Sequence, residues 1–256
     1  MKFEMLDKKM RSFEENLDQT VLPEVYIMAR LDGRGFTRLT KELLPLERPF
    51  DETFRDAMIE TVVHLMNCGF KVIYGYCQSD EISILFDRDE SGYGRKTRKL
   101  LSVLAGEASA KFTSEIGALG VFDCRIIPLP NEDLVVDYFR WRAEDASRNA
   151  LNAWCYWTLR KDGTNVADAT RHLEGKSTAD KNQFLFENGI NYNDLPAWQK
   201  RGVGFQYETF DSSSVNLKTG NVVSASRKKL IKQMTLPLNA EYESLIRKIL
   251  TESNNE

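Results

Sequence analysis

Runs of apolar and polar residues divide the first part of the chain into strands and helices. The continuous apolar run "VYIMARL" (residues 25–31) predicts a strand that is buried on both faces. Residues 51–66 place apolar side chains at helical spacing, and Asp51 is a candidate first residue of that helix. Residues 70–76 and 82–86 are rich in β-formers and are joined by a short polar segment, which predicts a hairpin.

A second helix and a last strand complete this part of the chain. One face of the helix carries Leu101, Leu104, Ala105, Ala108 and Phe112. The strand is "FDCRIIPLP" (residues 122–130), which ends in prolines. The order strand, helix, strand, strand, helix, strand predicts an α+β fold with a ferredoxin-like (split βαβ) core. In that topology the first strand and the hairpin are neighbours in one antiparallel sheet, so the ends of these strands can meet at one edge.

The second half of the chain reads as an extension of this core. Residues 138–157 predict an aromatic helix, and the segment from about Gly204 to Lys232 predicts a projecting hairpin with its turn at residues 218–221. No Pro/Gly/Ser-rich linker divides the chain. We therefore expect a core over residues 1–130 and a helical and hairpin extension over residues 131–256 that packs on it as one continuous unit.

The composition is that of a folded, soluble protein. Hydrophobic residues make up 42% and charged residues 29% of the chain, and the N-terminal segment mixes both charge signs without an apolar run. We expect a cytoplasmic protein with no membrane partner. The four cysteines (Cys68, Cys77, Cys124 and Cys155) are widely spaced and form no C-x-x-C pair, which favours reduced core thiols over zinc ligands or disulfides.

Net charge gives no global attraction to a polyanion. The formal charge is −3 and the isoelectric point is about 5.7. Binding to nucleic acid would have to use local basic segments, and three are present, at residues 94–99, 199–202 and 226–232.

Carboxylates mark the ends of the predicted central strands. Asp32 ends the first strand and is followed by Gly33, while Asp80 and Glu81 lie in the hairpin connection. Asp-Gly alone is typical of a turn, but the acids of the hairpin would repel one another unless a divalent cation were present. Asp32, Asp80 and the Gly33 carbonyl are hard oxygen ligands that could hold two Mg²⁺ ions.

Two Mg²⁺ ions at such a site are typical of nucleotidyl transfer. Arg95, Lys96 and Lys99 precede or open the second predicted helix and could hold a triphosphate together with its N-terminal amides; by spacing alone Arg30 and Arg48 are weaker candidates. The two histidines, His64 and His172, do not support a hydrolase triad.

Four spaced motifs resemble the tRNA(His) guanylyltransferase-like proteins, the 3′-to-5′ RNA polymerases. They are "RLDGRGFTRLTK", "YCQSDEISILF", "YFRWRAEDASRNALNAWCYW" and "STADKNQFLFENGINYNDLP", in this order across most of the chain. The resemblance implies a polymerase-palm-like core in which Asp32, Asp80 and Gly33 bind two Mg²⁺ ions with help from Glu81. It also implies ATP and GTP as substrates, tRNA as partner and a homotetramer.

Motif matches and basic segments together give two sets of candidate binding residues. The nucleotide-binding candidates are Arg30, Arg34, Gly35, Phe36, Arg48, Ser79, Arg95, Lys96 and Lys99. The RNA-binding candidates are Asn149, Lys176, Lys181, Asn182, Lys200, Arg201, Arg227, Lys228 and Lys229. A helix cap at Ser177 or Thr178 would explain the stretch at residues 176–182 equally well.

The reaction implied is addition of nucleotides to the 5′ end of a tRNA, after activation of a 5′-monophosphate by ATP. Eukaryotic members carry His-Ile-Asn-Asn-Leu-Tyr-Asn where this chain has Ser147, Arg148, Asn149 and the four residues that follow. The missing histidine favours the bacterial and archaeal branch, which repairs 5′-truncated tRNAs on a template, over a dedicated enzyme that adds G at position −1 of tRNA(His). A palm-type nucleotide cyclase and a non-catalytic tRNA-binding protein stay open as more distant alternatives.

Overall fold

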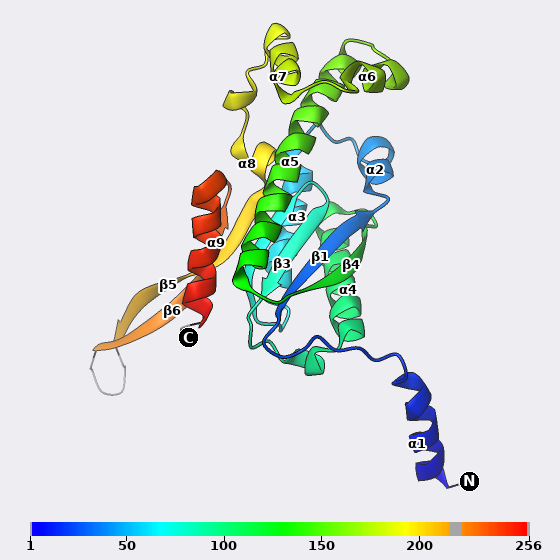
Figure 1. Ribbon diagram of the computed structural model, residues 1–256, viewed down its shortest axis with the longest axis vertical. Helices are drawn as coiled ribbons and strands as arrows, with labels where there is room; N and C mark the ends of the chain where they lie inside the picture. Colours follow the sequence, from blue (N-terminus) through cyan, green and yellow to red (C-terminus); the bar gives the residue numbers. More distant parts are fainter. Residues whose placement is uncertain (1, 216–221, 255–256) are drawn as a thin grey trace.

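A single six-stranded antiparallel sheet forms the centre of the computed structural model, which describes residues 2–215 and 222–254 (Figure 1). The strand order is β4-β1-β3-β2-β5-β6. The strands are β1 (Tyr26–Arg34), β2 (Val72–Gln78), β3 (Glu81–Phe86), β4 (Val121–Leu129), β5 (Val203–Val215) and β6 (Val222–Gln233).

The first four strands confirm the predicted ferredoxin-like core. They occur in the order β1-α3-β2-β3-α4-β4, with helices α3 (Glu52–Leu65) and α4 (Thr97–Ile116). Asp51 is the N-cap of α3 and accepts a hydrogen bond from the Phe54 amide at 2.9 Å, as its position before the helix predicts. In α4 the buried face contains Leu100, Leu104, Ala108 and Phe112, so Leu100 takes the core position that the sequence assigned to Leu101.

Strand β1 is buried on both faces because helices cover both sides of the sheet. Ile27, Ala29 and Leu31 pack with α3 and α4, and Tyr26 and Met28 pack with α5 (Glu132–Lys161) and α9 (Asn239–Asn254). The alternation of side chains along a strand explains why the run is apolar throughout.

The extension both enlarges the sheet and projects from it. The hairpin β5–β6 joins the sheet through β2, over four residue pairs from Tyr74↔Gln206 to Cys77↔Val203. Beyond the sheet, α5 carries α6 (Val166–Leu173) and α7 (Thr178–Glu187) around a small core of their own, and η3 (Tyr192–Asp194) and α8 (Ala197–Arg201) lead back to β5 (Figure 1). The turn predicted at residues 218–221 lies outside the described residues.

The remaining elements are short or stand apart. Helix α2 (Phe36–Arg38) and the π-helix η1 (Leu39–Leu43) follow β1, and η2 (Gly92–Arg95) precedes α4. Helix α1 (Phe3–Glu14) lies away from the rest of the chain (Figure 1). Across residues 2–215 and 222–254, none of the helices has the length and apolar character needed to span a bilayer.

Candidate active site

The three predicted catalytic acids lie together at one end of the strands β1 and β3, and this end of the sheet is called the acid edge. Asp32 in β1 is opposite Glu81 in β3, and the Gly33 amide donates a hydrogen bond to the Asp80 carbonyl at 3.0 Å. Strands β2 and β3 are joined by the two-residue turn Ser79–Asp80, in which Ser79 has a left-handed φ of 53°. Strand pairing therefore fixes the relative position of the three acids.

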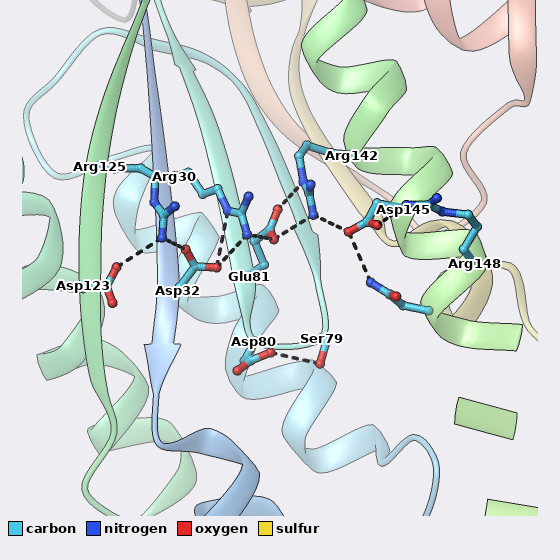
Figure 2. A network of polar contacts seen from close by, with 11 residues as sticks. Arg30, Asp32, Ser79, Asp80, Glu81, Asp123, Arg125, Arg142, Asp145 and Arg148 are labelled. Atoms are coloured by element: carbon cyan, nitrogen blue, oxygen red, sulfur yellow. Dashed lines mark hydrogen bonds and ion pairs between the residues drawn. The ribbon is translucent and has the colours of Figure 1, made fainter. Parts of the chain in front are cut away.

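Arginines and carboxylates alternate across this edge (Figure 2). The Asp32 carboxylate accepts from Arg30 at 3.1 Å and from Arg125 at 2.8 Å. Glu81 contacts Arg30 at 2.6 Å and accepts from Arg142 through both oxygens, at 2.6 and 2.9 Å. Because guanidinium groups cover both Glu81 oxygens, the role that the geometry supports for this carboxylate is positioning, not proton abstraction.

The sequence did not single out Arg125 or Arg142. Arg125 is opposite Arg30 in the pairing of β1 with β4, so the predicted sheet could have placed it beside Asp32. Arg142 comes from α5, is 7% exposed, and also contacts Asp145 at 2.8 Å. Arg142 lies within the quoted motif at residues 138–157, but no local pattern points to its partner, which is 61 residues away.

Asp80 differs from the other two acids in its environment. The Ser79 hydroxyl donates to it at 3.2 Å, and among the described residues no guanidinium or ammonium group is paired with it. Burial, and to a lesser extent the negative charge of Asp32, raise the pKa of Asp80. An ionised carboxylate in this position fits a cation.

The donor set at the acids fits magnesium. Carboxylate and carbonyl oxygens are the ligands that Mg²⁺ prefers, and it commonly keeps waters or phosphate oxygens as well. No group of three or more His, Cys, Asp or Glu side chains within residues 2–215 and 222–254 is arranged as a metal site. A cation held by Asp32 and Asp80 would therefore depend on the Gly33 carbonyl and on oxygens of water or substrate.

Gly33 is required by packing as well. A Cβ atom at this position would lie 2.5 Å from the ring of Phe36. That ring is 3% exposed and packs against Phe54, Phe112 and Phe122. Phe36 is thus a core residue. It could contact a nucleotide only as part of the wall of the first cavity described below.

Two cavities flank the Ser79–Asp80 turn and share Pro49, Phe50 and Gln78 as well as the turn itself. The first, of about 200 Å³, lies toward α3 and is called the α3 cavity; its other walls include Lys41, Arg48, Arg55, Trp157 and Trp198. The second, of about 340 Å³, lies toward α5 and is called the α5 cavity; its other walls include Arg30, Tyr76, Glu81, Arg142 and Asn149.

Cations and aromatic rings combine in the α3 cavity. Arg48 lies 5.4 Å and Lys41 5.9 Å from the centroid of the Trp157 ring, and Arg55 lies 4.7 Å from that of Trp198. Burial lowers the pKa of Arg48, but an arginine keeps its charge at neutral pH. These walls suit a ligand with a flat ring and negative charge. Lys41 lies in a quoted motif but was not among the predicted binding residues.

Arg95, Lys96 and Lys99 are not brought to the acids of their own chain, and their contact with a triphosphate stays a prediction. Arg95 is buried and donates to the carbonyls of Val21, Val25, Arg88 and Glu90. Its partner Val25 precedes β1 and, at about 3.3 Å per residue, is about 23 Å along the chain from Asp32. At the same end of the sheet, Lys96 pairs with Asp18 at 2.7 Å and Lys99 lies over the ring of Tyr93.

The other nucleotide-binding candidates lie at the end of β1 or at the turn. Arg34 is exposed at the last position of β1, and Gly35 has a left-handed φ of 74° before α2. Ser79 is exposed and lines both cavities. These positions are beside the acids, as the motif match implies.

Two of the RNA-binding candidates have structural roles. Lys200 is buried, and its ammonium donates to the carbonyls of Tyr192 and Asn193 at 3.1 and 2.7 Å. Arg201 donates to the Leu236 carbonyl at 2.6 Å. These interior contacts account for the burial of the Lys200 ammonium, and its contact with RNA stays a prediction.

The other RNA-binding candidates are more accessible. Ser177 and Asp180 form a capping box at the start of α7, so the helix-cap interpretation is confirmed, with Lys176 and Lys181 partly exposed beside it. Asn182 donates to the Thr178 carbonyl at 2.9 Å, and Asn149 donates to Asp145 at 3.2 Å. On β6, the side chains of Arg227, Lys228 and Lys229 are exposed.

Comparison with known proteins assigns this arrangement to a family. Residues 7–130 match the profile of tRNAHis guanylyltransferase, and residues 133–247 match that of the Thg1 C terminal domain. The chain belongs to the tRNA(His) guanylyltransferase family. Members of this family are nucleotidyltransferases, so the acid edge and its cavities belong to an enzyme of that class.

Relatives and solved structures agree with the assignment. A probable tRNA(His) guanylyltransferase of Drosophila melanogaster is 32% identical over 202 residues, which are 75% of this chain and 70% of the relative. A bacterial tRNA(His) guanylyltransferase (Thg1)-like protein in complex with ATP superposes with a TM-score of 0.73 and 26% identity, over 96% of this chain and 99% of the other. A bacterial Thg1-like protein in complex with GTP shares the fold, with a TM-score of 0.71 and 24% identity over the same shares of the two chains.

Proposed function

We propose that the protein is a Mg²⁺-dependent 3′-to-5′ nucleotidyltransferase that adds nucleotides to the 5′ end of tRNA. The observation that carries this proposal is the position of Asp32 and Asp80 at one sheet edge, between two cavities with cationic walls. The ATP complex of the bacterial neighbour supports ATP as a substrate, and the relatives' activity supports GTP and tRNA.

Residues around the turn would divide the work of binding and positioning. Lys41 and Arg48 would bind phosphates in the α3 cavity, while its aromatic walls would exclude water from a bound base. Two Mg²⁺ ions held by Asp32, Asp80 and the Gly33 carbonyl would polarise the attacking oxygen and stabilise the leaving phosphate. Arg30 and Arg125, which contact Asp32, are placed to neutralise charge on a phosphate at the acids.

The reaction has two steps for a 5′-monophosphate end. The 5′-phosphate of the tRNA attacks the α-phosphate of ATP, so that pyrophosphate leaves and an adenylylated end forms. The 3′-hydroxyl of GTP, or of another nucleotide, then attacks the 5′-phosphate and AMP leaves. A 5′-triphosphate end needs only the second kind of step, with pyrophosphate as the leaving group.

We propose template-dependent repair of 5′-truncated tRNA as the preferred reaction, with addition of G at position −1 of tRNA(His) as the alternative. The departure at residues 147–153 from the eukaryotic motif supports repair, and the activity in the relatives' names supports the alternative. In this proposal residues 1–130 carry the catalysis, residues 131–256 bind RNA, and the enzyme acts in the cytoplasm as a homotetramer.

Extension of 5′-labelled tRNA tests the proposal. A 5′-truncated tRNA and a full-length tRNA(His) are incubated with ATP, GTP and Mg²⁺ and with wild type, Asp80→Ala or the exposed control Asp168→Ala on α6. We expect wild type and the control to extend the truncated tRNA to the paired length. The extension rate of Asp80→Ala should be at least 100-fold lower, about the effect of removing a key electrostatic group.

Other outcomes separate the rival functions. Extension of tRNA(His) alone, by one G, would favour the dedicated enzyme. A cyclic product from GTP without tRNA would favour a cyclase. Binding of tRNA with no extension by folded wild type would mean that the acids are not catalytic, and the proposal would be wrong.

A further inference from the structure

Helix α1 has an apolar face that no other described residue covers. Phe3, Leu6, Met10 and Phe13 are 79%, 41%, 50% and 67% exposed, and none of the twelve residues of α1 is buried. The helix stands apart from both faces of the sheet (Figure 1). Four large apolar side chains on an exposed helix indicate a binding surface.

The spacing of these side chains indicates what binds there. Their intervals of three, four and three residues are those of the a and d positions of a heptad, with Phe3 and Met10 at a and Leu6 and Phe13 at d. A helix with such a seam packs against another helix of the same kind. We propose that α1 pairs in parallel with α1 of a second copy of this chain, as a short two-stranded coiled coil.

Charges beside the seam specify the parallel orientation. Within the helix the g position holds Lys9, and the e positions hold Asp7 and Glu14. In a parallel pair each g residue faces the e residue of the next heptad in the partner, so Lys9 lies beside Glu14 of the second copy. An antiparallel pair would place lysine beside lysine and carboxylate beside carboxylate, which is unfavourable. Asp7 accepts from Arg11 within the helix, so Lys9 with Glu14 is the informative pair.

The polar face of α1 does not suit a membrane surface. Residues 2–15 contain four basic side chains (Lys2, Lys8, Lys9 and Arg11) and four acidic ones (Glu4, Asp7, Glu14 and Glu15), so their formal charges cancel. Helices that lie on membranes are rich in Lys and Arg on the polar face. Alternating signs around an apolar seam are typical of a coiled coil.

The length of α1 sets the strength of the pairing. Twelve residues span about 18 Å, less than two full heptads. Helices this short are marginal in isolation, so the pair is weak by itself and forms in a concentration-dependent manner. The pairing concerns assembly and does not depend on the proposed reaction.

Disulfide trapping tests the parallel register in the full-length protein. In a parallel pair the two copies of Leu6 face each other, so Leu6→Cys is expected to form a cross-linked dimer under mild oxidation. The control Lys8→Cys, at the outward f position, is expected to cross-link at least tenfold more slowly, as is wild type with its four native cysteines. Equal rates for the two variants would overturn the parallel pairing.

Charge exchange gives a second, independent test by sedimentation velocity over a range of concentrations. Lys9→Glu is expected to weaken association at least threefold, and Lys9→Glu with Glu14→Lys to restore it, while Lys8→Glu leaves it unchanged. Met10→Glu is expected to weaken it more than any single charge change. If Met10→Glu acts but the exchange restores nothing, α1 packs on another surface, and the proposal is wrong.

Discussion

At the residue scale, the Asp80 carboxylate is partly buried at the tip of the β2–β3 turn, beside Asp32 and without a cationic partner among the described residues. Burial and Asp32 raise its pKa above the value in the unfolded chain. The folded state therefore binds this proton more tightly than the unfolded state. The contribution to stability is favourable at acid pH and is lost as pH rises through the folded pKa, so ionised Asp80 destabilises the fold at neutral pH.

Asp80→Asn should consequently stabilise the protein while it inactivates the enzyme. We expect the Tm at pH 7 without Mg²⁺ to rise by about 2–4 °C, the shift that about 1 kcal/mol gives in a protein of this size. The gain should shrink as the pH is lowered through the raised pKa of Asp80, because wild-type Asp80 is then protonated as well. Calorimetry beside the exposed control Asp89→Asn checks this, and a Tm below that of wild type would contradict it. Added Mg²⁺ should raise the Tm of wild type more than that of Asp80→Asn.

Arg142 should act through Glu81 and the acids without contacting the substrate itself. Arg142→Gln leaves Glu81 with one arginine partner in a poorly hydrated position, and we expect a loss of about 3 kcal/mol in the free energy of unfolding. At temperatures where the variant is folded, the fold-decrease in its kcat should be larger than the fold-increase in its KM for nucleotides.

Arg140→Gln is the matched control for Arg142 on the same helix. Arg140 forms exposed ion pairs with Asp137 and Glu243, so its loss should cost less than about 1 kcal/mol. Similar losses in the two variants, measured by urea unfolding, would show that the Glu81 contact is no more than a surface ion pair.

The candidate site could be predicted as far as it depends on strand ends. Asp32, Asp80 and Glu81 interrupt apolar strands, and pairing of those strands then brings them together. Arg142 reaches the site from α5, and no local pattern states which residue a buried arginine will contact. The Asp51 cap of α3 was predictable because its partner is three residues away.

At the element scale, the direction of β3 explains why the start of α4 lies far from the acids of the same chain. Strand β3 begins at Glu81, beside the turn, and leads away from the acids, so whatever follows it lies at the far end of the sheet. The predicted strand order already contained this information. The cationic residues there join the segment before β1 to η2 and α4 instead.

Two arginine variants distinguish a structural role, expected for Arg95, from a nucleotide-binding role, expected for Arg48. Arg95→Gln removes charged hydrogen bonds to buried carbonyls, so we expect a loss of about 2 kcal/mol or more in stability and an unchanged KM for ATP. Arg48→Gln should raise the KM for ATP several-fold with little change in stability, since it lines the α3 cavity. Thermal unfolding and initial rates check both, and a raised KM for ATP in folded Arg95→Gln would support the predicted phosphate contact of Arg95.

At the scale of the whole molecule, the sheet joins the strands that carry the acids to the basic surface of β6. The first four strands carry the acids, and β5 and β6 extend the same sheet with Arg227 and Lys229 exposed on the last strand. The sequence predicted an extension that packs on the core as one continuous unit, and hydrogen bonds between β2 and β5 make its hairpin part of the same sheet. Sequence patterns show a hairpin without showing which strand it will pair with.

Charge reversal on β6 should weaken tRNA binding without affecting nucleotides. For Arg227→Glu with Lys229→Glu we expect a tRNA Kd at least tenfold higher and a salt dependence reduced by about one to two phosphate contacts. The KM for ATP should stay the same. Filter binding across salt concentrations checks this, with Lys248→Glu on α9 as the control, and an unchanged slope would remove β6 from the RNA surface.

The position of β1 and β3 inside the sheet also determines how often their backbone meets solvent. Each has a paired strand on both sides, whereas β4 and β6 lie at the two edges of the described sheet. Amide hydrogens of β1 and β3 should exchange with deuterium only through global unfolding, while those on the outer side of β4 exchange through local fraying. The backbone that carries Asp32 and Glu81 therefore keeps its shape for as long as the protein stays folded.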